Sequence, residues 1–435
     1  MSSLNQPVQG MSDISMPEIW LWRRMEELAR RVMARYGFEE LRTPIVEFEA
    51  VFTRSLGSTT DVVQKEMYTF ERSGRRLSLR PEGTAGVMRH ASGLSPAEAD
   101  GARWFYIGPM FRCERPQAGR RRQFHQCGVE CLEEPSPLVD AEILALQVDL
   151  LQAWGLGDCA VHLNTRGEAA GHAAMAQGLR EALEPHREAL CVDCLRRMDE
   201  NVLRVLDCKT SSCQAVVARL PPMTDFMSEA SRSYLAQVAS YLEAMGISYK
   251  LDPLLVRGLD YYEHTVWEIA GTTEGAQSAL AGGGRYRMKL GNREFFGVGF
   301  GIGLERVVHV LQTLGRAEAL LEPAPPLVWL VGLGEAAQEQ NLVWMRRLRA
   351  EGLSCRMAPG GSMKSQMRAA NKSGAAWTVI RGDDELKQQV AAVKNMVTGE
   401  QMTVGEADLV GTLKSLTSAG SALPQETPEA VGDLG

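Results

Sequence analysis

The stretch from Trp104 to Leu132, WFYIGPMFRCERPQAGRRRQFHQCGVECL, holds two apolar runs on either side of a loop rich in arginine, proline and glycine. This pattern predicts a β-hairpin over residues 103–132. In its second run Gln126, Gly128 and Glu130 share one face by the period of two. A gap without a side chain between an amide and a carboxylate could cradle a small polar ligand. The alternative is a cross-strand polar pair on a solvated face.

Four glycines alternate through a second strand-like run that ends at Gly303, at positions 297, 299, 301 and 303. The period of two puts them all on one face, so we expect bare backbone there, on which a flat ligand such as a purine could lie. Close packing against another element is the alternative. Arg306 follows in the first turn of the next helix, where a phosphate is favoured. Arg112, at the end of the first hairpin strand, could hold an ATP α-phosphate.

The segments around these strands predict helices and further strands. Residues 17–36 carry apolar side chains at helical spacing. Residues 40–48 predict a strand interrupted by Pro44, which belongs at an edge, a bulge or an interface because it cannot donate to a ladder. Residues 140–154 predict a further amphipathic helix, and strand signals resume over 254–269.

Composition changes along the chain predict separate domains. Helical patterns rich in alanine, arginine and glutamate indicate an inserted unit, and alternating strands and helices after a proline-rich linker indicate an α/β domain. We therefore expect an N-terminal tail over residues 1–15, a core over 16–164 and 248–322, a helical insertion over 165–247, an α/β domain over 326–416 and a disordered tail over 417–435.

The overall charge gives no field that would attract an anionic polymer, because 47 basic side chains face 54 acidic ones in 435 residues. Nucleic-acid binding would need the local basic patches at 112–122 and 341–372, for which solvated surface charge is the alternative. The N-terminus lacks the apolar run of an export signal, and no 18 consecutive apolar residues could span a bilayer. Together with nine cysteines, an odd number, this predicts free thiols in the cytoplasm.

Four of the cysteines form two close pairs separated by thirteen residues. Such spacing is compatible with a closed tetrahedral zinc site. Ordinary unligated thiols are the alternative, because Lys209 and the helical surroundings suit them equally. The candidate metal ligands are Cys191, Cys194, Cys208 and Cys213.

Several motifs together resemble the histidyl-tRNA synthetase family of class II aminoacyl-tRNA synthetases. YGFEELRTPIVE at 36–47 is similar to the first class II motif, FRCERPQAGRRRQFHQCGVE at 111–130 to the second, and GVGFGIGLER at 297–306 to the third. RGLDYY at 257–262 resembles the signature that separates the histidine enzymes from other class II members, and RPEGT at 80–84 fits as well. The match runs from about residue 10 to about residue 415.

The resemblance implies an α/β (α+β) fold, with an antiparallel sheet core flanked by helices, a helical insertion domain and a C-terminal mixed-sheet α/β anticodon-binding domain. It implies ATP-dependent ligation of L-histidine to tRNA(His) through a histidyl-adenylate, with Mg²⁺ accompanying ATP. It also implies a homodimer with the segment around Pro44 at its interface. Because no run of apolar residues could span a bilayer, we expect no membrane partner.

The resemblance further implies site residues. Arg112 and Arg257 would flank the α-phosphate and Arg306 would take the γ-phosphate end, as the three catalytic residues. The ATP site would add Glu114, Gly301 and Gly303. Histidine would be held by Glu82, Gly83, Thr84, Gln126, Glu130, Tyr261, Tyr262 and Tyr286. The tRNA acceptor end would meet Arg115, Gln117, Arg120, Arg121 and Arg122, and the anticodon would meet Lys364, Arg368 and Lys372.

Two rival functions stay open at this point. A non-catalytic synthetase-like regulatory subunit of histidine biosynthesis would lack the anticodon domain and lose motif residues, but Arg112, Arg257, Arg306 and residues 326–415 are all present. A class II synthetase for threonine or proline is the second rival. The RGLDYY string and Glu130 argue against it.

Overall fold

The computed structural model describes residues 5–57, 60, 62–116, 119–257, 261–271, 279–321 and 325–419. The chain divides into two compact units, Met1–Leu321 and Glu322–Gly435. Residues 420–435, most of the predicted disordered tail, lie outside the described part of the chain. Among the described residues, no helix has both the length and the apolar composition needed to cross a membrane.

The first unit is built on a mixed sheet, which has eight strands within the described residues. The six central strands, β5, β6, β11, β10, β9 and β7, are each antiparallel to their neighbours. At the two edges, β1 pairs with β5 in parallel and β8 pairs with β7 in parallel. The hairpin expected over 103–132 is therefore confirmed as β5 and β6. In spatial order the strands are β1 (Glu39–Glu40), β5 (Arg103–Phe111), β6 (Gln123–Cys131), β11 (Arg293–Gly303), β10 (Ala279–Leu290), β9 (Tyr262–Ala270), β7 (Ala160–Thr165) and β8 (Tyr249–Leu251).

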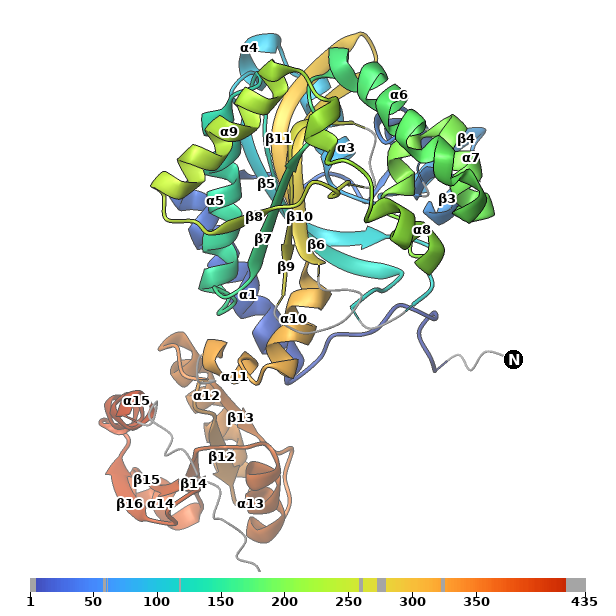
Figure 1. Ribbon diagram of the computed structural model, residues 1–435. Coiled ribbons are helices and arrows are strands. Elements are labelled where there is room, and N and C mark those ends of the chain that lie inside the picture. The colour runs from blue at the N-terminus through green and yellow to red at the C-terminus, as the bar shows by residue number, and fades with distance from the viewer. Residues whose placement is uncertain are drawn as a thin grey trace, which may run out of the picture. The chain divides into compact units, whose positions relative to one another are not determined.

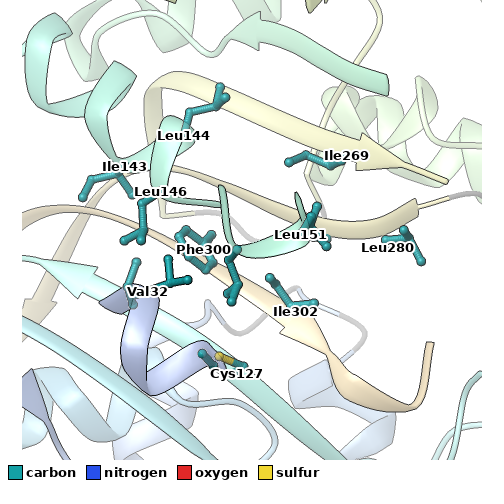
Figure 2. Packing of buried hydrophobic residues seen from close by; sticks show 14 of the residues in the cluster. Val32, Cys127, Ile143, Leu144, Leu146, Leu151, Ile269, Leu280, Phe300 and Ile302 are labelled. Atoms are coloured by element: carbon teal, nitrogen blue, oxygen red, sulfur yellow. The ribbon is translucent and has the colours of Figure 1, made fainter. Parts of the chain in front are cut away.

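Helices cover one face of this sheet and bury its apolar side chains (Figures 1 and 2). In β6, Cys127, Val129 and Cys131 point into this core, so the alternate residues face the other way. The same parity applies to β11, whose Val298, Phe300 and Ile302 join the core. The covering helices are α1 (Glu18–Arg35), α5 (Pro137–Ala153), α9 (Glu229–Ala244) and α10 (Leu304–Thr313), with the short α11 (Ala317–Leu320) beside α1.

Helix α5 differs from the amphipathic helix expected over 140–154. Its buried residues include Asp140, Ile143, Leu146 and Gln147, which lie on several sides of the helix. The reason is that α5 contacts the sheet, α1 and α9. A helix enclosed on most sides has no wide polar face to give a helical period.

The opposite face of the sheet carries α2 (Glu49–Ser55), α3 (Thr84–Ser92) and a small sheet of β2 (Val46–Phe48), β4 (Arg75–Leu79) and β3 (Thr69–Arg72). The single strand predicted over 40–48 is wrong. The chain leaves the large sheet after Glu40 and enters the small sheet at Val46, with Pro44 between the two strands. Proline fits this junction because it has no N–H to donate to either ladder. The remaining short elements of this region are η1 (Val62–Glu66) and α4 (Pro96–Ala99).

The predicted helical insertion has a core of its own, built from residues between Met175 and Met227. Helix α9, which was expected within the insertion, instead packs Leu235, Val238 and Leu242 into the core beneath the large sheet. The exact domain bounds remain a prediction. The insertion consists of η2 (Ala169–Gly171), α6 (His172–Leu183), η3 (Glu184–Ala189), α7 (Val192–Glu200), η4 (Val202–Val205), α8 (Ser211–Val217) and η5 (Met223–Phe226).

The second unit is the α/β domain that the alternating pattern predicts. Its sheet has the order β13-β12-β14-β15-β16. The first three strands are parallel to one another, whereas β15 is antiparallel to both of its neighbours, β14 and β16, so the sheet is mixed. Its elements are β12 (Val328–Gly332), α12 (Glu335–Ala350), β13 (Cys355–Met357), α13 (Met363–Lys372), β14 (Trp377–Arg381), α14 (Asp383–Gln388), β15 (Val390–Asn395), β16 (Gln401–Gly405) and α15 (Leu409–Ala419).

Candidate active site

A cavity of about 400 Å³ lies on the α3 side of the large sheet. It collects side chains from β5, β6, β9, β10 and β11, from the hairpin loop and from the insertion. Most of the residues expected at the site line it. These are Glu82, Thr84, Arg112, Glu114, Arg120, Arg121, Gln126, Glu130, Arg257, Tyr261, Tyr262, Tyr286, Gly301, Gly303 and Arg306.

Glu130 lines a buried part of this cavity, with 1% of its surface exposed. Its Oε1 accepts a hydrogen bond from Thr84 Oγ1 at 2.6 Å, and its Oε2 accepts one from Tyr286 Oη at 2.7 Å. Burial raises the pKa of Glu130 to about 8, although these two hydrogen bonds act to lower it. A carboxyl group that changes charge near neutral pH is suited to a partner such as imidazole, which titrates in the same range.

The start of α3 holds a second buried carboxyl group, Glu82. Its two oxygens accept hydrogen bonds from the backbone N–H groups of Thr84 at 2.8 Å and Ala85 at 2.7 Å. An ionised carboxylate has about four acceptor positions, so Glu82 can still receive a ligand cation. Beside it, the Gly83 N–H donates to Gln126 Oε1 at 3.2 Å. Gly83 therefore belongs to the site through its backbone.

The sequence predicts bare backbone on the glycine face of β11. The structure differs, because side chains of the site cover this face. A Cβ at Gly299 would lie 2.5 Å from Glu130 Oε2, and a Cβ at Gly297 would lie 2.6 Å from Tyr286 Oη. A Cβ at Gly301 would collide with the amide nitrogen of Gln126. The glycines thus make room for polar groups from β6 and β10 to lie across β11.

The gap expected at Gly128 is likewise filled. Tyr106 pairs with Gly128 across the hairpin, and its Oη lies 2.5 Å from where a Cβ of Gly128 would be. The same hydroxyl donates a weak hydrogen bond to Glu130 Oε1 at 3.4 Å. Sequence analysis missed Tyr106 as a site residue, although the cross-strand register of the hairpin contains the signal. The space between Gln126 and Glu130 therefore belongs to a phenol ring.

Arginines surround the more open part of the cavity. Arg112 is oriented by its Nε, which donates to the Pro81 carbonyl at 2.9 Å, and Arg257 pairs with Glu268 at 3.2 Å. Arg306 Nη1 donates to the Ala279 carbonyl at 2.6 Å. Burial lowers the pKa of Arg306, and the charges of Arg120 and Arg112 lower it further. Guanidinium groups this close together repel one another, so an anion placed among them would be strongly held.

The expected contacts of the tRNA acceptor end divide into three groups. Arg120 and Arg121 line the cavity. Arg122 instead donates through Nε to the Glu114 carbonyl at 3.2 Å, and the exposed Arg115 does not line the cavity. Gln117 lies outside the described residues. The loop thus brings two of its arginines to the mouth of the site.

Other cavity-lining residues were missed by sequence analysis. Glu268 on β9 pairs with Arg257 and lies opposite Gly282 of β10. No motif in the sequence around Glu268 indicates that it belongs to the site. Arg204 and Asp207 reach the cavity from the insertion. No pattern in the sequence indicates that a segment of the insertion returns to the core's site.

The four candidate zinc ligands come together in the insertion, with their sulfur atoms all within 4.8 Å of one another. Cys191 Sγ lies 3.8 Å from Cys208 Sγ. Two backbone N–H groups donate to sulfur in this cluster, from Cys191 to Cys213 Sγ at 3.2 Å and from Thr210 to Cys208 Sγ at 3.5 Å. This geometry fits a tetrahedral metal ion, for which Zn–S bonds of 2.3 Å put the sulfurs about 3.8 Å apart.

In the second unit, Lys364, Arg368 and Lys372 are exposed on α13. Their spacing of four residues places them in one stripe, opposite the buried Gln366 and Ala370. A basic stripe of this kind can follow a phosphate backbone.

Comparison with known proteins agrees with this architecture. The family model described as "Histidyl-tRNA synthetase" matches residues 10–307, and the model described as "Anticodon binding domain" matches residues 328–416. The histidine–tRNA ligase of Halothermothrix orenii is 42% identical over 94% of this chain and 98% of its own, and that of Solidesulfovibrio magneticus is 44% identical over 95% and 98%.

Solved structures give the same result. The apo histidyl-tRNA synthetase of S. aureus superimposes with a TM-score of 0.78 at 33% identity, covering 95% of this chain and all of that one. A Bacillus halodurans chain titled "ATP phosphoribosyltransferase regulatory subunit/histidyl-tRNA synthetase" has a TM-score of 0.60 at 17% identity over 88% of this chain, and this shows the shared fold alone.

The sheet, the three arginines and the glycine-lined pocket define a class II aminoacyl-tRNA synthetase. Within that class, the chain belongs to the histidyl-tRNA synthetase family. The resemblance stated from the motifs is confirmed. Relatives that match over nearly the full length also favour tRNA charging over the regulatory alternative.

Proposed function

We propose that the chain ligates L-histidine to tRNA(His) in two ATP-dependent steps. The observation that carries this proposal is Glu130, a buried carboxyl group framed by Thr84, Tyr106 and Tyr286, at the closed end of a cavity whose open part carries arginines. Neutral imidazole has one N–H donor and one acceptor. A carboxyl group and a phenol together can satisfy both, and amino acids that leave these groups unpaired would be rejected.

The other histidine contacts follow from chemistry and position. Glu82, Thr84 and Gln126 would bind the α-amino cation with one carboxylate and two neutral acceptors. Tyr262 would face the imidazole, with Tyr261 packed against both Tyr262 and Tyr286 at ring distances of 4.8 and 5.7 Å. The substrate carboxylate would then point towards Arg112 and Arg257.

The reaction needs no covalent bond to the enzyme. In the first step a histidine carboxylate oxygen attacks the ATP α-phosphorus, and pyrophosphate leaves. In the second step the terminal ribose hydroxyl of the tRNA attacks the carbonyl carbon of the histidyl-adenylate, and AMP leaves. Positioning and charge stabilisation by Arg112, Arg257 and Arg306 would therefore supply most of the rate enhancement.

The ATP site would also use Glu114, Gly301 and Gly303, which line the cavity near these arginines. Mg²⁺ would accompany ATP and neutralise its phosphate charge. Arg115, Gln117 and Arg120 to Arg122 would meet the acceptor end of the tRNA, and Lys364, Arg368 and Lys372 would meet the anticodon region.

The test is pyrophosphate exchange into ATP with each of the twenty amino acids in turn, without tRNA. Exchange with histidine alone is the expected result. No exchange with any amino acid, from folded protein that binds ATP, would instead favour the regulatory alternative.

We also propose a structural zinc ion bound by Cys191, Cys194, Cys208 and Cys213, supported by the sulfur geometry of the cluster. Metal analysis of protein purified without chelator should find about one zinc per chain. Substoichiometric zinc together with four freely titratable thiols would contradict this. Cys159→Ser, a substitution outside the cluster, is the matched control for Cys208→Ser.

We propose a homodimer with the small sheet at its interface. Ile45, Val46, Phe48 and Phe70 are apolar yet 41–52% exposed on β2, β3 and the segment before them. Apolar patches of this kind mark interaction surfaces. Phe48→Glu should give monomers in sedimentation equilibrium. The control is Leu251→Glu, at an equally exposed position on β8, which should remain dimeric. If both variants are dimers, the small sheet is not the interface.

The compartment that we propose is the cytoplasm. All nine cysteines lie within the described residues, and none forms a disulfide there, as expected in a reducing environment.

A further inference from the structure

The insertion supplies part of the wall of the reaction cavity. Arg204 and Asp207 line the cavity together with Arg112 and Arg257, although they belong to η4 and the turn that follows it. This short segment lies between the second and third cysteines of the thiol cluster. Two residues of the insertion thus lie at the proposed reaction site, whose other named residues come from the core.

The geometry of η4 explains why Arg204 faces the cavity. Val202, Leu203 and Val205 are buried in the insertion's own core, whereas Arg204 is only partly buried. A 3₁₀ helix has three residues per turn. The backbone N–H groups of Leu206 and Cys208 donate to the carbonyls of Leu203 and Val205, three residues earlier, so this spacing continues past η4 and places positions 204 and 207 on the same side. The Arg204 carbonyl also accepts a hydrogen bond from Arg197 Nη1 at 3.3 Å, which ties the backbone of η4 to α7.

The charges at this wall favour an anion. Asp207 pairs with Lys209, with 2.9 Å between Oδ1 and Nζ, so its negative charge is compensated. A guanidinium group such as that of Arg204 presents paired N–H donors, which can form two parallel hydrogen bonds to a phosphate. The histidine end of the cavity, around Glu130, is fully buried, while Arg112, Arg204 and Arg257 are only partly buried. Arg204 thus lines the same cavity as Arg112 and Arg257, the residues that we propose to hold phosphate.

The thiol cluster adjoins this segment directly. Cys208 follows Asp207, and its sulfur accepts a hydrogen bond from the Thr210 backbone N–H at 3.5 Å. Its sulfur also lies 3.8 Å from that of Cys191, at the start of α7. An ion held by these sulfurs would fix both ends of the segment that carries Arg204.

We propose that Arg204 is a phosphate-binding residue of the reaction cavity, and that the thiol cluster sets its position. This inference rests on the proposed function, because the phosphate would belong either to ATP or to the acceptor end of the tRNA. Both present the same chemistry to the guanidinium, so separate measurements must distinguish them.

The test compares Arg204→Ala with Arg196→Ala, a matched substitution of an exposed arginine on α7 that does not line the cavity. If Arg204 binds ATP, its loss should raise the dissociation constant of ATP and the KM for ATP in pyrophosphate exchange by about tenfold. If it binds the tRNA phosphate, exchange should be unchanged and transfer of histidine from preformed adenylate to tRNA should slow by about tenfold. Values within about twofold of wild type in both measurements would overturn the proposal.

ATP binding is measured by equilibrium dialysis without histidine. This measurement stands even if wild-type enzyme shows no histidine-dependent exchange, so failure of the proposed function is recognised separately. If Arg204→Ala does not fold, Arg204→Lys decides, because lysine keeps the charge but not the paired donors. A partial loss in either measurement supports the proposal and full wild-type behaviour overturns it.

The positioning role is tested with Cys208→Ser and with the double variant. Cys208→Ser should lower the zinc content and weaken ATP binding or histidine transfer as much as Arg204→Ala does. The double variant Arg204→Ala/Cys208→Ser should show no larger effect than either single variant. Additive losses, or a wild-type response of Cys208→Ser, would show that the cluster does not position Arg204. Cys159→Ser should leave zinc content and both measurements unchanged.

Discussion

At the residue scale, the site depends on side chains that lie across glycines. Gly299 pairs with Glu130 between β11 and β6, and the absence of a Cβ lets the Glu130 carboxyl group turn over the neighbouring strand. The same relation joins Gly297 to Tyr286 and Gly128 to Tyr106. Three pairs of this kind orient the groups proposed to recognise histidine.

Gly299→Ala should therefore reduce histidine-dependent exchange by about 10²-fold. The new Cβ would lie too close to the Val129 carbonyl oxygen on β6 and 2.5 Å from Glu130 Oε2, so both the strand and the carboxyl group must shift, and a shift of about 1 Å at a reaction site has an effect of this size. The exchange assay, with the KM for histidine, checks this. Gly411→Ala, where nothing lies within 4 Å of the added Cβ, is the control. Exchange close to wild type in Gly299→Ala would contradict the role given to this glycine.

Glu130 also makes stability depend on pH. Its pKa in the folded protein is about 8, raised from 4.5 mainly by burial. A raised carboxyl pKa favours folding while the group is protonated, so this contribution is full below about pH 4.5 and is lost as pH rises towards 8. Glu130→Gln stays neutral throughout and loses this dependence.

Denaturant unfolding at pH 5, 6.5 and 8 should consequently show a smaller fall in the free energy of unfolding for Glu130→Gln than for wild type. Glu181→Gln, an exposed position on α6, should follow the wild-type curve. Identical pH slopes for Glu130→Gln and wild type would show that Glu130 is ionised in the folded protein well below pH 8.

At the scale of elements, a buried ion pair joins four of them. Asp140 on α5 accepts hydrogen bonds from Arg285 on β10 at 2.6 Å, Thr265 on β9 at 2.5 Å and Tyr234 on α9 at 3.0 Å. Both charged side chains have no exposed surface. The next residue along β10, Tyr286, points to the opposite face and donates to Glu130. The pair therefore anchors the strand that carries a site residue.

Asp140→Asn should lower the free energy of unfolding by about 3–5 kcal/mol, because it leaves the Arg285 charge buried without its partner. Asp158→Asn removes an exposed pair with Arg316 and should cost about 1 kcal/mol or less. Denaturant titration of both variants checks the difference. Equal small losses would mean that water or another group compensates Arg285.

At the scale of the whole molecule, the two units carry different candidate sites. The cavity and all its lining residues belong to the first unit, and the basic stripe of α13 belongs to the second. Under the proposed function, formation of the adenylate would need only the first unit, whereas recognition of the tRNA would use both.

Arg368→Glu should therefore weaken tRNA binding and charging while leaving histidine-dependent exchange unchanged. Loss of one phosphate contact should also reduce the salt dependence of tRNA binding by about one unit of slope. Lys387→Glu, on α14 outside the stripe, is the control. Equal losses of exchange and charging would remove Arg368 from the proposed tRNA surface.

The sequence by itself determined the elements whose patterns are local. The helix at 17–36, the hairpin at 103–132 and the strands and helices after residue 326 follow from periodicity and turn residues, and the structure confirms them. The motifs also determined the family, because Arg112, Glu130, Arg257 and Arg306 stand in its characteristic strings.

Only the tertiary structure decided what fills the space that the glycines leave and which distant segments complete the site. Tyr106 occupies the gap at Gly128, and Arg204 reaches the cavity from the insertion. It also decided that α9 packs with α5 and that the chain changes sheets around Pro44. These features depend on contacts between residues far apart in sequence, and the local periods of two and 3.6 residues carry no information about such contacts.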